Sequence, residues 1–201
     1  MDLSDLFEEL SKKGFQNPDS GNLFFPAYIY CYDPTKEYEL REEIVGIKDR
    51  LIRPDIYQEC MVINIFDEFI EYLKSEKLGD ETLFELYRQQ EKEDNPEETT
   101  ENLKHIATSR EFFETVDGKI RRHFELPSDY KKVYVLVHGF GSIFPYLRAS
   151  EFLKRFEEYV SGGGYKIIVF YPGKFENNQF HLFNEINDEN IYRASLLNRV
   201  K

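Results

Sequence analysis

Cysteine and clustered histidine are scarce in this chain, and their scarcity excludes several kinds of protein. Only two cysteines, Cys31 and Cys60, occur among 201 residues, which excludes a disulfide scaffold and a four-thiolate zinc site. Both lie in apolar, strand-like stretches, so we expect buried, reduced thiols. The four histidines are dispersed, and none has a second histidine four residues away as many zinc sites do. We therefore predict no metal site.

A long apolar run is also missing. A signal peptide or a membrane span needs an uninterrupted apolar segment, whereas the stretch Met1–Glu9 carries four acidic residues. We therefore expect a soluble, cytoplasmic protein without membrane contact.

Positive charge is in deficit, with 26 Lys and Arg against 38 Asp and Glu and a net charge of −12. A field of this sign repels polyanions unless a local basic surface overcomes it, so we expect no direct DNA binding. The strongest local exception is Lys119–His123, followed by Lys131 and Lys132, but no aromatic stacking platform or recognised DNA-binding motif accompanies it. We interpret this stretch as a solvated helix face, with a polyanion contact as the alternative.

Strands and helices alternate along the sequence. The hydrophobic content of 41% in 201 residues is enough for one core, so we predict a single domain over residues 1–201. Apolar stretches predict four strands, namely Leu23–Tyr32, Cys60–Ile63, Lys132–Val137 and Lys166–Tyr171. The order of elements predicts an α/β fold with a single open, mainly parallel sheet of four or five strands, flanked by helices and carrying a helical insert over about residues 78–125.

Helical spacing of apolar residues predicts the remaining elements. Helices are expected over Leu3–Lys13, over Glu37–Arg53, and after Asn64, which is placed to cap the next dozen residues. The insert is predicted as one helical stretch over Asp80–Gln90, an exposed and mobile acidic linker over Glu91–Glu98, and one or two helices over Thr99–Arg122. At the C-terminal end we expect an edge strand over Gln179–Phe183 and an irregular or helical tail over Asp188–Val200.

The loop after the third predicted strand occupies the place where nucleotide-binding folds hold phosphate. Its candidate ligand- or partner-binding residues are Gly139, Gly141, Ser142, Pro145 and Arg148. The phosphate-loop pattern needs a Lys followed by Ser or Thr, and no such pair occurs in this loop; the third glycine of the dinucleotide pattern is also missing. We therefore favour a structural turn, keep a ligand or partner contact as the alternative, and predict no cofactor.

Two further features of this loop shape the functional interpretation. His138 and Gly139 after a strand resemble the oxyanion loop of α/β-hydrolases, but no Gly-x-Ser-x-Gly nucleophile elbow occurs in the chain, so we assign no catalytic residues. Gly141 is expected to permit either a sharp exit from the strand or a close approach at the start of the following helix.

A second candidate region follows the fourth predicted strand. Its polar and aromatic residues would suit a cleft at the carboxyl ends of the strands or an interface, and they are Pro172, Gly173, Phe183, Asp188, Tyr192 and Arg193. The structural alternative is that Asp188 and Arg193 pair locally while Tyr192 packs on the sheet.

Taken in order along nearly the whole chain, these segments resemble one family, the BrxB component of BREX phage-defence systems. The resemblance rests on Tyr32–Pro34, Ile63–Asp67, Gly139–Arg148, Tyr171–Gly173 and Leu182–Phe183 with Asn190–Ala194. It implies a small cytoplasmic protein without established catalytic activity, which works beside an ATPase, a DNA methyltransferase and an alkaline-phosphatase-like component called PglZ. The family has no agreed catalytic set to carry over.

Two functions remain open at this point. The first is a non-catalytic protein-interaction subunit that assembles with other BREX components, most of all PglZ. The second is a degenerate phosphate-loop-like enzyme that binds a nucleotide or a small molecule through Gly139–Arg148. Because 14 Tyr and 18 Phe are a large aromatic content for 201 residues, some are expected at an interface. The helix around Phe7 and the segment Phe180–Tyr192 are the expected surfaces.

Overall fold

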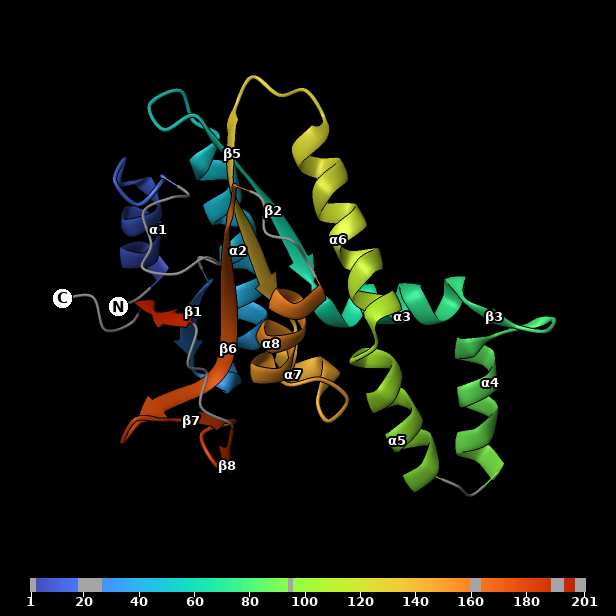
Figure 1. Cartoon of the computed structure of the whole chain (residues 1–201). Helices are drawn as coiled ribbons and strands as arrows, with labels where there is room; N and C mark the ends of the chain where they lie inside the picture. Colours follow the sequence, from blue (N-terminus) through green and yellow to red (C-terminus); the bar gives the residue numbers. More distant parts are fainter. Residues whose placement is uncertain (1–2, 18–26, 94–95, 160–163, 189–193, 198–201) are drawn as a thin grey trace.

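Five parallel strands form the sheet on which the rest of the chain is arranged (Figure 1). The computed structural model describes residues 3–17, 27–93, 96–159, 164–188 and 194–197. The strand order is β2-β5-β6-β1-β9, with every neighbouring pair parallel. The prediction of an open, mainly parallel sheet flanked by helices is confirmed. The strands are β1 (Ala27–Tyr32), β2 (Gln58–Asn64), β5 (Lys131–His138), β6 (Lys166–Glu176) and β9 (Ala194–Leu196).

The two central strands are apolar on both faces, which is why they lie in the middle of the sheet. Along β5 the side chains of Val135 and Val137 enter one core cluster, whereas Tyr134 and Leu136 enter the other. Side chains of a strand point alternately to opposite faces, so a strand with helices on both sides needs this continuous apolar run.

Helices cover both faces of the sheet (Figure 1). On one side α1 (Leu3–Ser11) and α2 (Glu37–Leu51) bury their apolar residues with the smaller core cluster. On the other side lie α3 (Ile65–Ser75), α6 (Arg110–Glu125) and α8 (Ala149–Tyr159). The connections after β1 and β5 therefore leave toward opposite faces, an arrangement that brings the residues after these strands together at the carboxyl edge of the sheet. No helix in the described ranges is long and apolar enough to cross a membrane.

The segment between α3 and α6 differs in part from the prediction. The expected helix over Asp80–Gln90 begins with a two-stranded hairpin, β3 (Lys77–Leu78) and β4 (Glu81–Thr82), and α4 covers only Leu83–Gln90. The expected mobile linker over Glu91–Glu98 contains a short 3-10 helix, Glu91–Glu93, and the first turn of α5 (Pro96–Ala107). Proline suits a first helical turn, where its missing N–H has no partner to lose, so Pro96 starts a helix instead of breaking one.

The open choice between one and two helices after this point is resolved as two. Helix α5 ends at Ala107, and α6 begins at Arg110. The Ser109 hydroxyl between them accepts a hydrogen bond from the Phe112 N–H at 3.3 Å. This N-cap satisfies one of the backbone donors that a helix start leaves unpaired.

The C-terminal part also corrects the prediction. Strand β6 continues past Tyr171 to Glu176 and pairs antiparallel with β7 (Gln179–Leu182), which confirms the expected edge strand, and β8 (Ile186–Asn187) pairs with β7 in turn. The tail from Asp188 was expected to be irregular or helical, but Ala194–Leu196 forms β9 beside β1. Three residues are too short for a periodic pattern, so the sequence carries little signal for this strand.

The chain leaves β5 through a sharp turn that only glycine fits well. Gly139 has φ +91°, and a Cβ built on it would lie 2.1 Å from Oδ1 of Asn64. The single helical turn α7 (Phe140–Ile143) follows at once. At Gly141 a Cβ would lie 3.3 Å from Cε1 of Phe183. Gly139 therefore permits the sharp exit from β5, and Gly141 permits the close approach of Phe183.

We predict that Gly139 and Asn64 are energetically coupled. Gly139→Ala should destabilise the fold by about 1–3 kcal/mol for the left-handed backbone, and by more because of the contact with Asn64. Asn64→Ala removes that contact, together with the α3 cap worth about 1 kcal/mol. Urea unfolding of both single variants and the double variant should give a coupling of at least about 0.5 kcal/mol.

Gly46→Ala is the control for this cycle, because a Cβ at Gly46 meets nothing within 4 Å. Its effect should be neutral or slightly stabilising, since alanine favours a helix interior over glycine. Equal costs for Gly139→Ala with and without Asn64 would contradict the coupling.

Candidate functional site

The predicted loop and the predicted C-terminal segment lie against each other at the carboxyl edge of the sheet. Gly141 approaches the side chains of Phe183 and Pro172. The rings of Phe144 and Phe183 meet edge to face, with centroids 5.6 Å apart and an angle of 88°. The two regions predicted as separate candidates are therefore one packed unit.

A buried carboxylate, Asp188, holds this unit together. Its Oδ1 accepts a hydrogen bond from the Ser150 hydroxyl at 2.9 Å, and its Oδ2 accepts one from the Tyr171 hydroxyl at 3.2 Å. Nη1 of Arg148 lies 3.6 Å from Oδ1 and also donates to the carbonyl oxygen of Asn187 at 3.2 Å. Burial and the neighbouring Asp188 charge raise the pKa of Tyr171, so its hydroxyl stays protonated and available as a donor.

The alternative that Asp188 pairs with Arg193 stays a prediction. Tyr192 and Arg193 lie outside the described residues. Within the described ranges the partner cation of Asp188 is Arg148, which comes from the other candidate region.

A second polar cluster tethers the start of the loop to the opposite face of the sheet. Nη2 of Arg41 donates to the Ser142 hydroxyl at 3.0 Å, and Nε of Arg41 donates to Oε1 of Glu37 at 3.0 Å. The Tyr32 hydroxyl donates to the other Glu37 oxygen, and burial with this contact raises the pKa of Tyr32. Sequence reasoning missed Arg41 and Glu37, because a charge on an amphipathic helix looks like a solvated position.

His138 ends β5 beside this cluster and is the buried titratable group nearest the loop. It is 7% exposed, and its Nδ1 has no hydrogen-bond partner among the described residues. Burial lowers the pKa of His138, and the Arg41 charge lowers it further against the opposing charges of Glu37 and Asp67. The imidazole is therefore neutral at pH 7, and no ion pair holds it.

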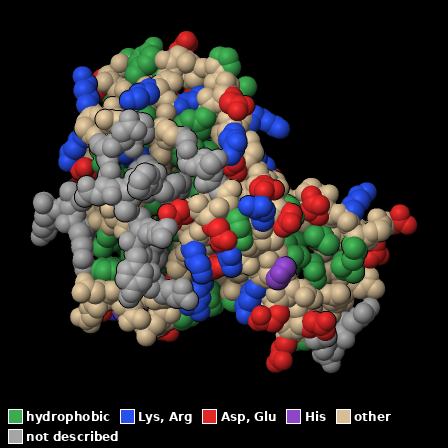
Figure 2. Space-filling model, in the orientation of Figure 1, with side chains coloured by type: hydrophobic (Ala, Val, Ile, Leu, Met, Phe, Trp, Pro, Cys, Tyr) green, Lys and Arg blue, Asp and Glu red, His purple; other side chains and the backbone are tan. Residues whose placement is uncertain are grey.

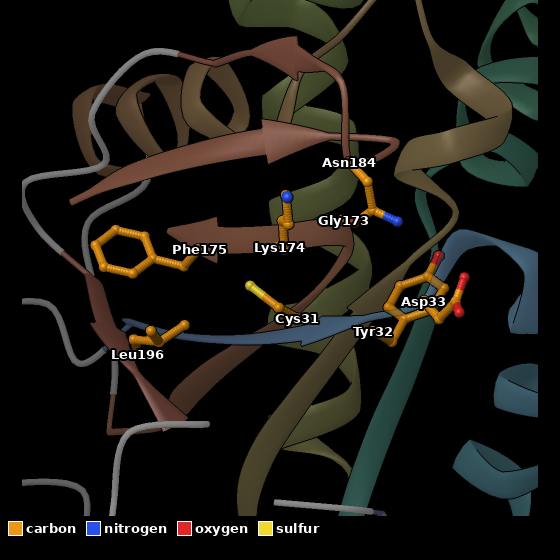
Figure 3. Close-up of a pocket in the computed structure, with 8 residues that line it drawn as sticks. All are labelled: Cys31, Tyr32, Asp33, Gly173, Lys174, Phe175, Asn184 and Leu196. Carbon is orange, nitrogen blue, oxygen red and sulfur yellow. The ribbon is translucent and has the colours of Figure 1, made fainter. Parts of the chain in front are cut away.

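One hollow opens at the carboxyl end of β1 (Figure 3). Its volume is about 400 Å³, and among the predicted site residues that the structure describes Gly173 alone lines it. Gly173 has φ +154°, and a Cβ there would lie 2.0 Å from the carbonyl oxygen of His181, so glycine is needed for the strand to turn. The lining residues are Cys31, Tyr32, Asp33, Gly173, Lys174, Phe175, Asn184 and Leu196.

The thiol in this hollow is a poor nucleophile. Burial raises the pKa of Cys31 to about 12, so the thiol is protonated at neutral pH. Cys60 is likewise a free cysteine, and burial raises its pKa to about 12. Neither cysteine forms a disulfide with a described residue, and Cys60 is buried as expected, whereas Cys31 is only half-buried.

A larger hollow of about 660 Å³ lies between α5 and the end of the loop. Pro145 and Arg148 line it, whereas Ser142 bonds toward α2 on the other side of the sheet. Its carboxylates already have cations of this chain, since Lys104 binds Glu101 at 2.6 Å and Arg155 binds Glu151 at 2.7 Å. The loop residues thus point to two places and do not converge on one ligand.

The described residues contain no cluster of three or more His, Cys, Asp or Glu side chains placed to hold a metal. The local basic stretch is also used internally, because Lys119 binds Glu68 and Glu71 while Arg121 binds Asp117. On the face drawn in Figure 2, Lys and Arg side chains lie interspersed with Asp and Glu.

The described aromatic residues of the two expected surfaces are buried or half-buried. Phe180 and Leu182 are 4% and 1% exposed and belong to the core, so the prediction of an exposed segment beginning at Phe180 is wrong for these residues. Phe7 is half-buried, and the guanidinium carbon of Arg50 lies 4.1 Å from the centre of its ring. Most Phe and Tyr side chains of the described residues are buried or half-buried.

Fold and site together define the class of protein: an α/β protein with a parallel sheet. Its loop Gly139–Arg148 lies in the position of a phosphate loop but is held by contacts of Ser142 and Arg148 with the rest of the protein. Comparison places this chain within a family. A family model described as BREX protein BrxB matches residues 61–197, and the chain belongs to that family. A BREX protein BrxB of Bacillus cereus (strain H3081.97) is 23% identical over 193 residues, which cover 96% of this chain and 93% of the relative. No solved structure matches the chain.

We predict that Asp188→Ala is strongly destabilising, by about 2–4 kcal/mol, because it leaves the buried Tyr171 hydroxyl and the half-buried Ser150 hydroxyl without their acceptor and Arg148 without its carboxylate. Glu101→Ala is the matched control, since it breaks an exposed ion pair beside the same loop and should change stability by less than about 0.5 kcal/mol. Urea unfolding measures both. Similar small effects would show that Asp188 does not hold the unit together.

We predict that His138 weakens the protein in acid. Because its pKa is lowered in the folded state, the unfolded chain takes up the proton first, and stability falls as pH drops below the unfolded value of about 6.5. The fall ends once the folded pKa is passed. His138→Gln should flatten the loss of unfolding free energy between about pH 7 and pH 5. An unchanged slope in His138→Gln would contradict this account.

Proposed function

We propose that this chain is a non-catalytic interaction and assembly subunit of a BREX-type anti-phage defence complex. The support is the membership of the BrxB family together with the condition of the Gly139–Arg148 loop. We further propose that it acts in the cytoplasm, as one domain, beside other BREX components, with the alkaline-phosphatase-like PglZ as the first candidate partner.

The observation that carries this proposal is the internal engagement of the loop. A phosphate-binding loop needs free backbone N–H groups and room for an anion. Here Gly139 abuts Asn64, Gly141 abuts Phe183, and the Ser142 hydroxyl accepts from Arg41. A loop whose groups already contact the protein favours a structural role over ligand binding.

Electrostatics support a protein partner over nucleic acid. The net charge is −12, and the cations of the strongest basic stretch, Lys119 and Arg121, are paired with carboxylates. An acidic surface attracts a basic protein surface and repels a phosphate backbone.

Co-expression tests the proposal directly. The tagged full-length chain, expressed with the other BREX components of its operon, should co-purify with at least one of them, and omission of each component in turn identifies the direct partner. Failure to recover any component would sink the proposal and reopen the enzyme hypothesis.

A ligand screen tests the competing function. If the loop bound a nucleotide, ATP, GTP or a dinucleotide at a hundred times its Kd would add about 2.7 kcal/mol of stability and raise Tm. We expect no shift for these compounds. A reproducible shift that Ser142→Ala abolishes would favour the degenerate phosphate-loop enzyme.

A further inference from the structure

Two of the most exposed large apolar side chains lie on one helix. Tyr38 is 82% exposed and Val45 is 55% exposed, and both belong to α2. They are seven residues apart, which is two turns, so they share one side of the helix. The side facing the sheet is buried and consists of Leu40, Ile44, Ile47 and Leu51.

Carboxylates without cations fill the positions between and beside these two side chains. The outward stripe runs Tyr38, Glu42, Val45, Asp49, with spacings that follow the helical repeat. Glu42, Glu43 and Asp49 have no ion-pair partner among the described residues, in contrast to Glu37, which binds Arg41. Exposed apolar anchors beside these three unpaired carboxylates form the surface that we call the α2 face, defined by Tyr38, Glu42, Glu43, Val45, Gly46 and Asp49. The guanidinium carbon of Arg41 lies 5.9 Å from the centre of the Tyr38 ring, and Arg50 and Arg53 border the face.

A hollow lies beside the stripe of Tyr38 and Val45. Gly46 lies beside the stripe, and a Cβ built there would meet nothing within 4 Å. The hollow has a volume of about 450 Å³ and is lined by Glu42, Glu43, Gly46, Asp49, Arg50 and Arg53. A neighbouring hollow of about 460 Å³ beside Phe7 shares the lining residue Arg53.

We propose that the α2 face is the docking surface for a basic amphipathic helix of a partner protein. The proposal rests on the assembly function and names the surface that serves it. Lysine and arginine of the partner neutralise Glu42, Glu43 and Asp49, while apolar side chains pack against Tyr38 and Val45 and into the hollow at Gly46. A helix suits this place because side chains at helical spacing fit the groove that a missing side chain leaves on another helix.

Other occupants fit less well. Nucleic acid would bring phosphate against three carboxylates. A second copy of this chain, joined through a two-fold axis, would place the same carboxylates opposite one another. A basic protein segment satisfies both the charge and the apolar anchors.

Paired variants test the proposal in the co-expressed complex. Tyr38→Ala combined with Glu42→Lys should lower the affinity for the direct partner by at least about tenfold, because it removes an aromatic anchor and reverses a complementary charge. The matched control is Leu126→Ala with Glu125→Lys at the end of α6, where Leu126 is 57% exposed. The control should bind like the wild type. Circular dichroism first verifies that both variants are folded, as expected for exposed positions.

A photo-crosslinking residue at position 45 identifies the occupant independently. The expected adduct maps to a partner segment of helical periodicity that contains several Lys or Arg residues, and Glu42→Gln should weaken binding less than Glu42→Lys. An adduct with a second copy of this chain, or with a segment lacking basic residues, overturns the inference.

The outcomes separate the inference from the proposed function. Equal binding by wild type and both double variants contradicts the α2 face while leaving the assembly function intact. Loss of binding in both variants also counts against it, because α2 is then not singled out. If the wild type recovers no component, the assembly function fails and the docking surface fails with it.

Discussion

The Asp188 carboxylate is the constraint on which the carboxyl edge of this protein depends. A buried charge is costly unless it is paired and hydrogen-bonded, so the surrounding chain has to supply donors. They come from separate elements: Ser150 from α8, Tyr171 from β6 and Arg148 from the loop. One carboxylate thereby fixes the strand end, the loop and the C-terminal segment relative to each other. At the other end of the loop, the Arg41 contact with Ser142 ties α2 to the same edge.

A loop fastened at both ends is a rigid part of the framework, and this changes where function is sought. In open parallel sheets the carboxyl edge is the usual ligand site. Here the side chains of Asp188, Arg148 and Ser142 at that edge are hydrogen-bonded within the protein, the nearby imidazole is neutral, and the half-buried Cys31 thiol is protonated. The outward side of α2 has the opposite character, with exposed apolar groups and unpaired charge. Interaction through a helix face is consistent with a subunit whose sheet serves as scaffold.

Much of the fold can be predicted from the sequence, whereas much less of the candidate site can be predicted. The apolar runs at Lys132–Val137 and Lys166–Tyr171 predict central strands because a strand buried on both faces has few other compositions. Strand β9 and the β3–β4 hairpin could not be predicted from the sequence. Strands of two or three residues are too short to show the alternation of apolar and polar residues that marks a strand. Both candidate regions were found from residue type, yet the contact of Arg148 with Asp188 was not, since it joins residues far apart in the sequence. Local sequence patterns predict the helices and strands, whereas only the tertiary structure shows which side chains contact one another.

The position of β1 in the sheet sets the order in which this fold is completed. Among the described residues it is the first strand in the sequence, but Ala27 pairs with Ile167 on one side and Ala194 on the other, so both neighbours are synthesised long after it. Until the ribosome has delivered them, an apolar strand of sequence AYIYCY has no sheet to join. Such pairing over long sequence separations slows folding and exposes the strand to association with other chains. Because of this topology, the nascent β1 segment stays unpaired during synthesis and needs protection until β6 and β9 have been made.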